Sequence, residues 1–206
     1  GCDRRGGHLY RFLSDGVVSN PNNPANSALL HNGTLYGAVF NPDGTGTWIA
    51  LTPNTPIQPL AAPVQVPHSN RSKAGSETLN SPQDIAAYRE RYGNLGALYQ
   101  GDGEAQLGAL LIDAHLAANA AGITPTARPE DTVLDPASGD LLVTFTSGMP
   151  GNDGTPDPAI FRGPQGQSPW NEGWIMRLSE QGENRFRWQM VATGGEPADG
   201  GLGFAN

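Results

Sequence analysis

The chain has 206 residues, of which 28 are glycine and 18 are proline, and its formal net charge is -8. A hydrophobic content of 37% can supply a core, and a charged content of 16% is too low for a charged disordered tail. No apolar run approaches the roughly 18 residues of a membrane-spanning helix, and the residue periodicity of a coiled coil is missing, so we expect neither class.

The basic residues do not form a cluster of the kind that binds nucleic acid. Lys73 is the single lysine among 12 basic residues, and the arginines are scattered along the chain. We therefore expect no nucleic-acid partner. An acidic chain can still bind a phosphorylated ligand where individual arginines or metal ions supply local positive charge. Cys2 is the only cysteine, so no disulfide can form within the chain.

The first 51 residues predict short strands joined by turns. Residues 8–14 alternate apolar and polar side chains, as a half-buried strand does. The Asn-Gly pair at 32–33 indicates a tight turn, because both residues tolerate a positive φ. Residues 34–51 carry two apolar runs around the turn sequence 41–46, and we expect them to form a β-hairpin.

The middle of the chain predicts a loop followed by helices. Residues 52–80 contain five prolines and are expected to form an extended loop or linker. Ser81 as N-cap, followed by Pro82 and an acidic residue in the first turn, predicts a helix that runs to about Tyr92. A second helix is predicted at about 106–121. The chain should therefore make a partly helical excursion at about 81–122.

Strands are predicted again after residue 131. Residues 132–134 and 140–146 flank a turn at 135–139, and residues 173–179 and 185–191 form another hairpin-like pair. Residues 147–169, rich in glycine, proline and aspartate, are expected to form a loop.

Three strand pairs, at 34–51, 132–146 and 173–191, resemble one another loosely. Repeated units of this kind favour a β-propeller, in which each blade is a short antiparallel sheet of roughly 40–50 residues. Two to three blades fit in this chain, so we expect residues 1–206 to be a fragment of a propeller and an incomplete domain. A β-sandwich with a helical insertion is the alternative fold.

Four stretches of the chain share a common pattern with a known family. They are residues 1–14, residues 32–51, the Arg-Pro-Glu-Asp motif at 128–131 with the turn after it, and residues 171–177. In this order they resemble the PhoX-type alkaline phosphatases, which are bacterial metal-dependent phosphoesterases built on a β-propeller, and residues 1–14 are similar to the opening of a blade in that family. Together they span nearly the whole chain apart from the loop at 52–80.

The resemblance implies hydrolysis of phosphomonoesters by a protein that binds iron and calcium ions, acts on a phosphorylated small molecule and is periplasmic or secreted. Metal ions suit this chemistry because they neutralise the phosphoryl oxygens and supply a nucleophilic oxygen at neutral pH. A non-catalytic propeller that binds a ligand, and a propeller hydrolase that acts on lactones or sugars, are the alternative functions. The oligomeric state is left open.

Arg128 and Glu130 are the main candidate site residues. They stand two positions apart on a predicted extended segment, so their side chains should lie on the same face. The residues alone favour a surface ion pair, or a helix-to-strand corner stiffened by Pro129. The resemblance favours Arg128 as a phosphate clamp, in which a guanidinium fork holds two phosphoryl oxygens, and Glu130 as a metal ligand.

The resemblance also implies metal ligands near the amino-terminal end of the chain. Asp3 stands where the family has an acidic pair, and Cys2 stands at the first position of that pair. A cysteine thiolate can bind iron, and a small buried residue is the alternative role for Cys2.

Three other residues bear on the site less directly. Asp131 is expected to be a turn residue, and His115 a packing or surface residue of the second helix. Trp174 stands where the family has a histidine, which is a departure from the family pattern.

Overall fold

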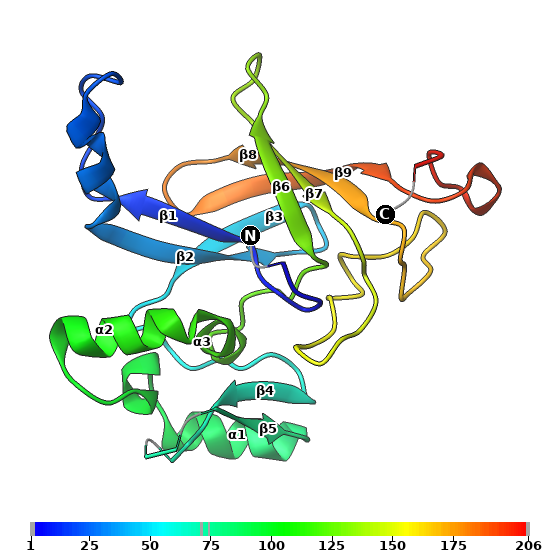
Figure 1. Cartoon of the computed structure of the whole chain (residues 1–206). Helices are drawn as coiled ribbons and strands as arrows, with labels where there is room; N and C mark the ends of the chain where they lie inside the picture. The colour runs from blue at the N-terminus through cyan, green and yellow to red at the C-terminus, as the bar shows by residue number, and fades with distance from the viewer. Residues whose placement is uncertain (1–2, 71, 74, 205–206) are drawn as a thin grey trace.

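Seven antiparallel strands form one curled sheet in the computed structural model, which describes residues 3–70, 72–73 and 75–204 (Figure 1). The order across this sheet is β1-β2-β3-β9-β8-β7-β6. The strands are β1 (Tyr10–Ser14), β2 (Gly33–Phe40), β3 (Thr45–Ala50), β6 (Pro129–Leu134), β7 (Leu141–Phe145), β8 (Trp174–Glu180) and β9 (Arg185–Thr193). Each predicted strand and hairpin of the large sheet is therefore confirmed.

The sheet consists of two meanders, β1-β2-β3 and β6-β7-β8-β9, that meet where β3 pairs with β9. This junction has three residue pairs, and Gly46 opposite Phe186 is the central one. A Cβ atom at Gly46 would lie 2.2 Å from an atom of the Phe186 ring. Because glycine has no Cβ, the ring can lie over the strand, and the two meanders form one continuous sheet.

The predicted helical excursion at 81–122 is confirmed, but its second helix is divided. The helices are α1 (Pro82–Arg91), α2 (Gly103–Ile112) and α3 (Ala114–Ala120). At the start of α1, the Ser81 hydroxyl accepts from the Asp84 amide while the Asp84 carboxylate accepts from the Ser81 amide, which is a capping box. The single helix predicted at 106–121 is wrong, because Asp113 leaves the helical conformation, with φ -97° and ψ 25°.

The predicted loop at 52–80 contains a short hairpin that the proline content concealed. It is formed by β4 (Val64–Pro67) and β5 (Ser76–Leu79). Pro67 stands at the end of its strand, where proline is tolerated. Three short 3₁₀ helices complete the described elements: η1 (Pro24–Leu30), η2 (Leu95–Leu98) and η3 (Pro197–Asp199).

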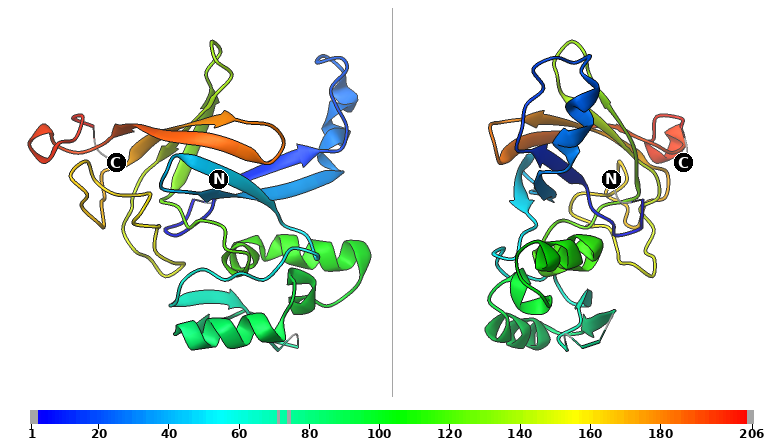
Figure 2. Two further views of the ribbon diagram at one scale, coloured as in Figure 1. Left: turned by 180° about the vertical axis from the view of Figure 1, so that it is seen from behind. Right: turned by 60° about the vertical axis from the view of Figure 1, so that its left-hand side comes forward.

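The helices and the small hairpin lie beneath one face of the large sheet (Figures 1 and 2). The buried apolar side chains of the described residues form two hydrophobic cores. The sheet core centres on aromatic residues such as Phe145, Phe161 and Trp174. The excursion core is built from α1, α2, α3 and the small hairpin. At Gly37 of β2, a Cβ atom would lie 2.3 Å from the side chain of Ile123, so glycine permits the close contact between the sheet and the end of the excursion.

This architecture confirms a mainly β fold with a helical excursion, consistent with a propeller fragment. Within the described residues the strands pair continuously rather than as separate blades, so the number of blades and the incomplete domain over 1–206 stay predictions. The second sheet has two strands, β4 and β5, and does not form the second layer that a β-sandwich requires. Of the helices in the described ranges, none is long and apolar enough to cross a membrane.

Candidate functional site

The Arg-Pro-Glu motif lies where the amino-terminal segment meets the start of β6. Thr126 pairs with Gly7 as an isolated antiparallel bridge, and its amide donates to the Gly7 carbonyl at 2.6 Å. The Thr126 hydroxyl donates to the same carbonyl at 3.0 Å. On the other side, the Thr146 amide donates to the Arg128 carbonyl at 2.9 Å. These contacts hold Arg128 between the amino-terminal segment and the end of β7.

Arg128 forms ion pairs with two carboxylates at once. Its Nε and Nη2 atoms donate to the two oxygens of Asp3, at 2.8 and 3.2 Å. Nη2 also lies 3.0 Å from Oε1 of Glu130, and the Thr146 hydroxyl donates to the same oxygen at 3.1 Å. The expectation that Arg128 and Glu130 share a face is therefore met, and Asp3 lies beside them. We call Asp3, Arg128 and Glu130 the arginine cluster.

The arginine cluster is open to solvent. The side chains of Arg128 and Glu130 are each 34% exposed, and that of Asp3 is 50% exposed. The hydrogen bond from Arg128 holds the pKa of Asp3 below its ordinary value, and the hydrogen bond to Asp3 raises the pKa of Arg128. Asp3 and Arg128 are therefore charged at neutral pH. By formal charge, two carboxylates and one guanidinium leave the cluster with one excess negative charge.

The arginine cluster could supply part of a metal site. Two carboxylates suit calcium, which takes six to eight oxygen ligands, so Asp3 and Glu130 could provide some of them. Cys2, the third predicted ligand, lies outside the described residues. Within the described ranges, no group of three or more His, Cys, Asp or Glu side chains is placed to hold a metal ion. A metal bound here needs further ligands beyond these two carboxylates.

The other residues considered from sequence lie apart from the arginine cluster. Asp131 does not stand in a turn but at an irregularity of β6, where its carboxylate accepts from the Thr132 amide at 2.7 Å. Trp174 is buried in the sheet core, and its indole N–H donates to the Arg162 carbonyl at 3.0 Å. The departure from the family pattern at Trp174 therefore places an apolar core residue at this position.

A buried polar network connects the amino-terminal segment to α3, and sequence reasoning missed it. His8 is fully buried, with Nδ1 3.1 Å from the Thr124 carbonyl and Nε2 3.0 Å from Oδ1 of Asn119. The Asn119 amide donates to the Gln65 carbonyl at 2.9 Å, which turns its oxygen toward His8. The His115 ring lies 5.2 Å from the His8 ring.

Burial keeps both histidines uncharged at neutral pH. Desolvation, and to a smaller extent the neighbouring His115, lowers the pKa of His8 to about 4. Desolvation also lowers the pKa of His115, whose Nε2 lies 3.0 Å from the Asp153 carbonyl. The prediction of His115 as a packing residue therefore fits its contacts. Neutral His8 carries one N–H, so it donates to one of its two oxygen partners, Asn119 Oδ1 or the Thr124 carbonyl.

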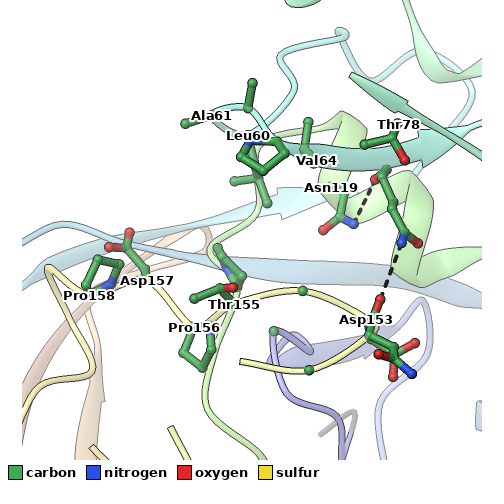
Figure 3. Close-up of a pocket in the computed structure, with 18 residues that line it drawn as sticks. Leu60, Ala61, Val64, Thr78, Asn119, Asp153, Thr155, Pro156, Asp157 and Pro158 are labelled. Carbon is green, nitrogen blue, oxygen red and sulfur yellow. Dashed lines mark hydrogen bonds between the residues drawn. The ribbon is translucent and has the colours of Figure 1, made fainter. Parts of the chain in front are cut away.

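A cavity of about 610 Å³ lies between the small hairpin and the loop at 151–158 (Figure 3). Its walls include Leu60, Val64, Asn119 and Gly6. Of the described residues that line it, none is arginine, lysine or histidine, and none belongs to the arginine cluster. Nothing in this cavity therefore supplies the positive charge that a phosphoryl group requires.

The comparisons with known proteins identify both the family and the fold. The alkaline phosphatase PhoX family matches residues 1–205. A solved structure of Pseudomonas fluorescens PhoX in complex with vanadate, a transition state analogue, is 25% identical in sequence with a TM-score of 0.60. The match covers 95% of this chain and 28% of that structure. No curated protein sequence matches.

The family match thus covers almost every residue, including the arginine cluster and both meanders of the sheet. The resemblance seen in four ordered stretches is confirmed over the whole length that they span. The structural similarity extends through the helical excursion, since it covers 95% of the chain. The chain belongs to the PhoX alkaline phosphatase family.

Proposed function

We propose that the protein hydrolyses phosphomonoesters as a metal-dependent alkaline phosphatase, with this chain contributing part of the active site. Membership of the PhoX family supports this function. The similar Pseudomonas fluorescens structure carries vanadate, which its description calls a transition state analogue. Because the chain spans 28% of that structure, the activity is proposed for the whole protein.

The observation that carries the proposal is the position of Arg128 between two carboxylates. Its contacts with Asp3 and Glu130 fix the direction of the guanidinium without burying it. A phosphomonoester carries about two negative charges near neutral pH. With Nε and Nη2 directed at the two carboxylates, the guanidinium can donate to a phosphoryl oxygen from Nη1. Arg128 is thus oriented before the substrate arrives, which lowers the entropic cost of binding.

The excess negative charge of the arginine cluster explains why bound metal ions are part of the proposal. Asp3 and Glu130 repel a phosphate dianion unless a cation neutralises them. We propose that Glu130, Asp3 and Cys2 contribute ligands to calcium and iron ions, with carboxylates suited to calcium and a thiolate suited to iron. Bound metal ions supply charge neutralisation for the phosphoryl oxygens and activate a water at neutral pH.

The test uses the full-length, metal-loaded protein and p-nitrophenyl phosphate. Arg128→Ala should lower kcat/KM by about 10² to 10³, as expected when an oriented charged donor is removed from a reacting group. Arg162→Ala, at an exposed arginine outside the arginine cluster, is the matched control and should leave kcat/KM unchanged. A chelator should abolish turnover. Unchanged turnover in Arg128→Ala would remove Arg128 from the site.

A non-catalytic binding module is the second candidate function. The ion pairs of Arg128 with both Asp3 and Glu130 favour it, because each carboxylate then has a partner without a metal. Elemental analysis of the full-length protein separates the two functions: bound calcium or iron supports the phosphatase, and their absence supports the binding module. Profiling against lactones and sugars tests the remaining alternative, a hydrolase of those compounds.

We also propose that the protein acts in the periplasm or outside the cell. The support for this location is membership of the PhoX family. A protein in either compartment would meet its substrate outside the cytoplasm. Fractionation of cells that express the full-length protein tests this location. Recovery in the cytoplasmic fraction alone would contradict it.

A further inference from the structure

The cavity beside the small hairpin has the size and walls of a site for a small organic ligand. Its volume of about 610 Å³ lies within the roughly 300–1,000 Å³ of typical ligand pockets. Aliphatic and proline residues from 60–64 form one wall, and the loop at 151–158 forms another (Figure 3). This lining suits a ligand with an aliphatic body.

The charged groups of the cavity are both negative. Asp153 and Asp157 lie at the two ends of the loop wall in Figure 3, and no arginine, lysine or histidine is among the described residues that line the cavity. Asp153 forms an ion pair with Arg4, at 3.1 Å. Asp157 accepts a hydrogen bond from the Ala159 amide at 2.8 Å, and no ion pair to it is found among the described residues. Asp157 is therefore the carboxylate available to a cation.

The cavity is held open by contacts between segments that are distant in sequence. The Gln65 side chain donates to the Asn152 carbonyl at 3.3 Å and so links the small hairpin to the loop wall. Asn119, which is 4% exposed, is fixed by His8 on one side and by the Gln65 carbonyl on the other. A site of this kind requires little rearrangement on binding.

We propose that this cavity binds a small organic cation, in which an ammonium group on an aliphatic body pairs with Asp157. Apolar walls accept the aliphatic part, and the carboxylate of Asp157 favours a cation over an anion. The site is separate from the arginine cluster, so the proposal does not depend on phosphatase activity. The same electrostatics exclude phosphorylated compounds as ligands of this cavity.

The test compares three probes of equal chain length by isothermal titration calorimetry with the full-length protein at pH 7.5. Hexylammonium should bind about tenfold or more tightly than hexanoate, and 1-hexanol should fall between them. Asp157→Asn should weaken hexylammonium about fivefold and leave 1-hexanol unchanged, because the substitution removes charge but keeps the oxygen that accepts from Ala159.

Two further variants fix the location of the site. Asp15→Asn, at an exposed carboxylate after β1, is the matched charge control and should bind hexylammonium as the wild type does. Ala61→Trp places an indole against the cavity and should abolish binding of all three probes. Circular dichroism confirms that each variant is folded. Binding of hexanoate as tight as hexylammonium, no binding of hexylammonium, or an unchanged affinity in Asp157→Asn or Ala61→Trp each overturns the proposal.

Discussion

The arginine cluster and the buried network around His8 make opposite uses of the same amino-terminal segment. Asp3 meets Arg128 at the surface, where all the groups are charged and at least a third exposed. Five residues later, His8 meets Asn119 and the Thr124 carbonyl in the interior, where all the groups are neutral. Exposed ion pairs contribute little stability, whereas buried polar groups cost much when a partner is lost. The network therefore stabilises the fold, and the arginine cluster remains available for chemistry.

The largest expected effect on stability is at Asn119. Asn119→Ala removes the partner of His8 Nε2 and the donor to the Gln65 carbonyl, so two polar groups are left unpaired inside the protein. At about 1–3 kcal/mol for each group, the free energy of unfolding should fall by about 3 kcal/mol. Urea denaturation measures this value. Asn22→Ala, at an exposed asparagine, should change it by less than about 0.5 kcal/mol.

The pH dependence of the free energy of unfolding tests the contribution of His8 to stability. Because the pKa of His8 is about 4 in the folded protein and that of an unperturbed histidine is 6.5, the unfolded chain takes up a proton first as the pH falls. The contribution of His8 to stability should be constant above about pH 6.5, decrease between about 6.5 and 4, and level off below, with a total loss of about 3 kcal/mol from His8.

The groups that face His8 also affect the measured pH dependence of stability. The rings of His115 and Tyr10 contact it, and burial lowers the pKa of His115 as well. His8→Gln should therefore reduce the slope between pH 6.5 and 4 without removing it completely. His31→Gln, at an exposed histidine, is the matched control. A slope in His8→Gln equal to that of the wild type would show that His8 does not titrate as described.

A smaller effect is expected at the bridge that connects the two regions. Thr126 is fully buried, and Thr126→Val keeps its shape while removing the hydroxyl that donates to the Gly7 carbonyl. The carbonyl keeps the Thr126 amide as a donor, so the loss should be about 1 kcal/mol. Thermal unfolding followed by circular dichroism measures it, with the exposed Thr132→Val as control. An equal change in both variants would assign no role to the buried hydroxyl.

The smallest effect on stability is expected at Arg128, the residue proposed to matter most for activity. Its ion pairs are partly exposed and screened by salt, so Arg128→Ala should change the free energy of unfolding by less than about 1 kcal/mol. Urea denaturation of the variant used in the kinetic test provides the measurement. A loss comparable to that of Asn119→Ala would mean that the arginine cluster is structural, and the contrast between the two regions would fail.

Local patterns predicted the elements that depend on neighbouring residues. The β2-β3 hairpin follows from its turn sequence, and α1 follows from Ser81 and Pro82 at its start. The break between α2 and α3 could not be predicted, because it depends on Asp113, whose carboxylate accepts from the Tyr99 hydroxyl at 2.8 Å in the folded chain. The small hairpin was concealed by Pro63, which precedes β4, and by Pro67, which is its last residue.

The arginine cluster could be predicted in part, because one of its contacts also depends on neighbouring residues. Arg128 and Glu130 are two residues apart on an extended segment, so their contact follows from strand geometry. The family resemblance pointed to Asp3, although its partner is 125 residues away. His8 and Asn119 carry no pattern that joins them across 111 residues, so only the fold brings them together.

The junction of β3 with β9 has a consequence for biosynthesis. β3 ends at Ala50, and its neighbour β9 begins at Arg185. A ribosome adds roughly 5–20 residues each second, so the first meander emerges several seconds before the strand that completes its sheet. During that interval the edge of β3 is open to pairing with other nascent chains. Dependence on chaperones should therefore be greatest before β9, which begins at Arg185, has been translated.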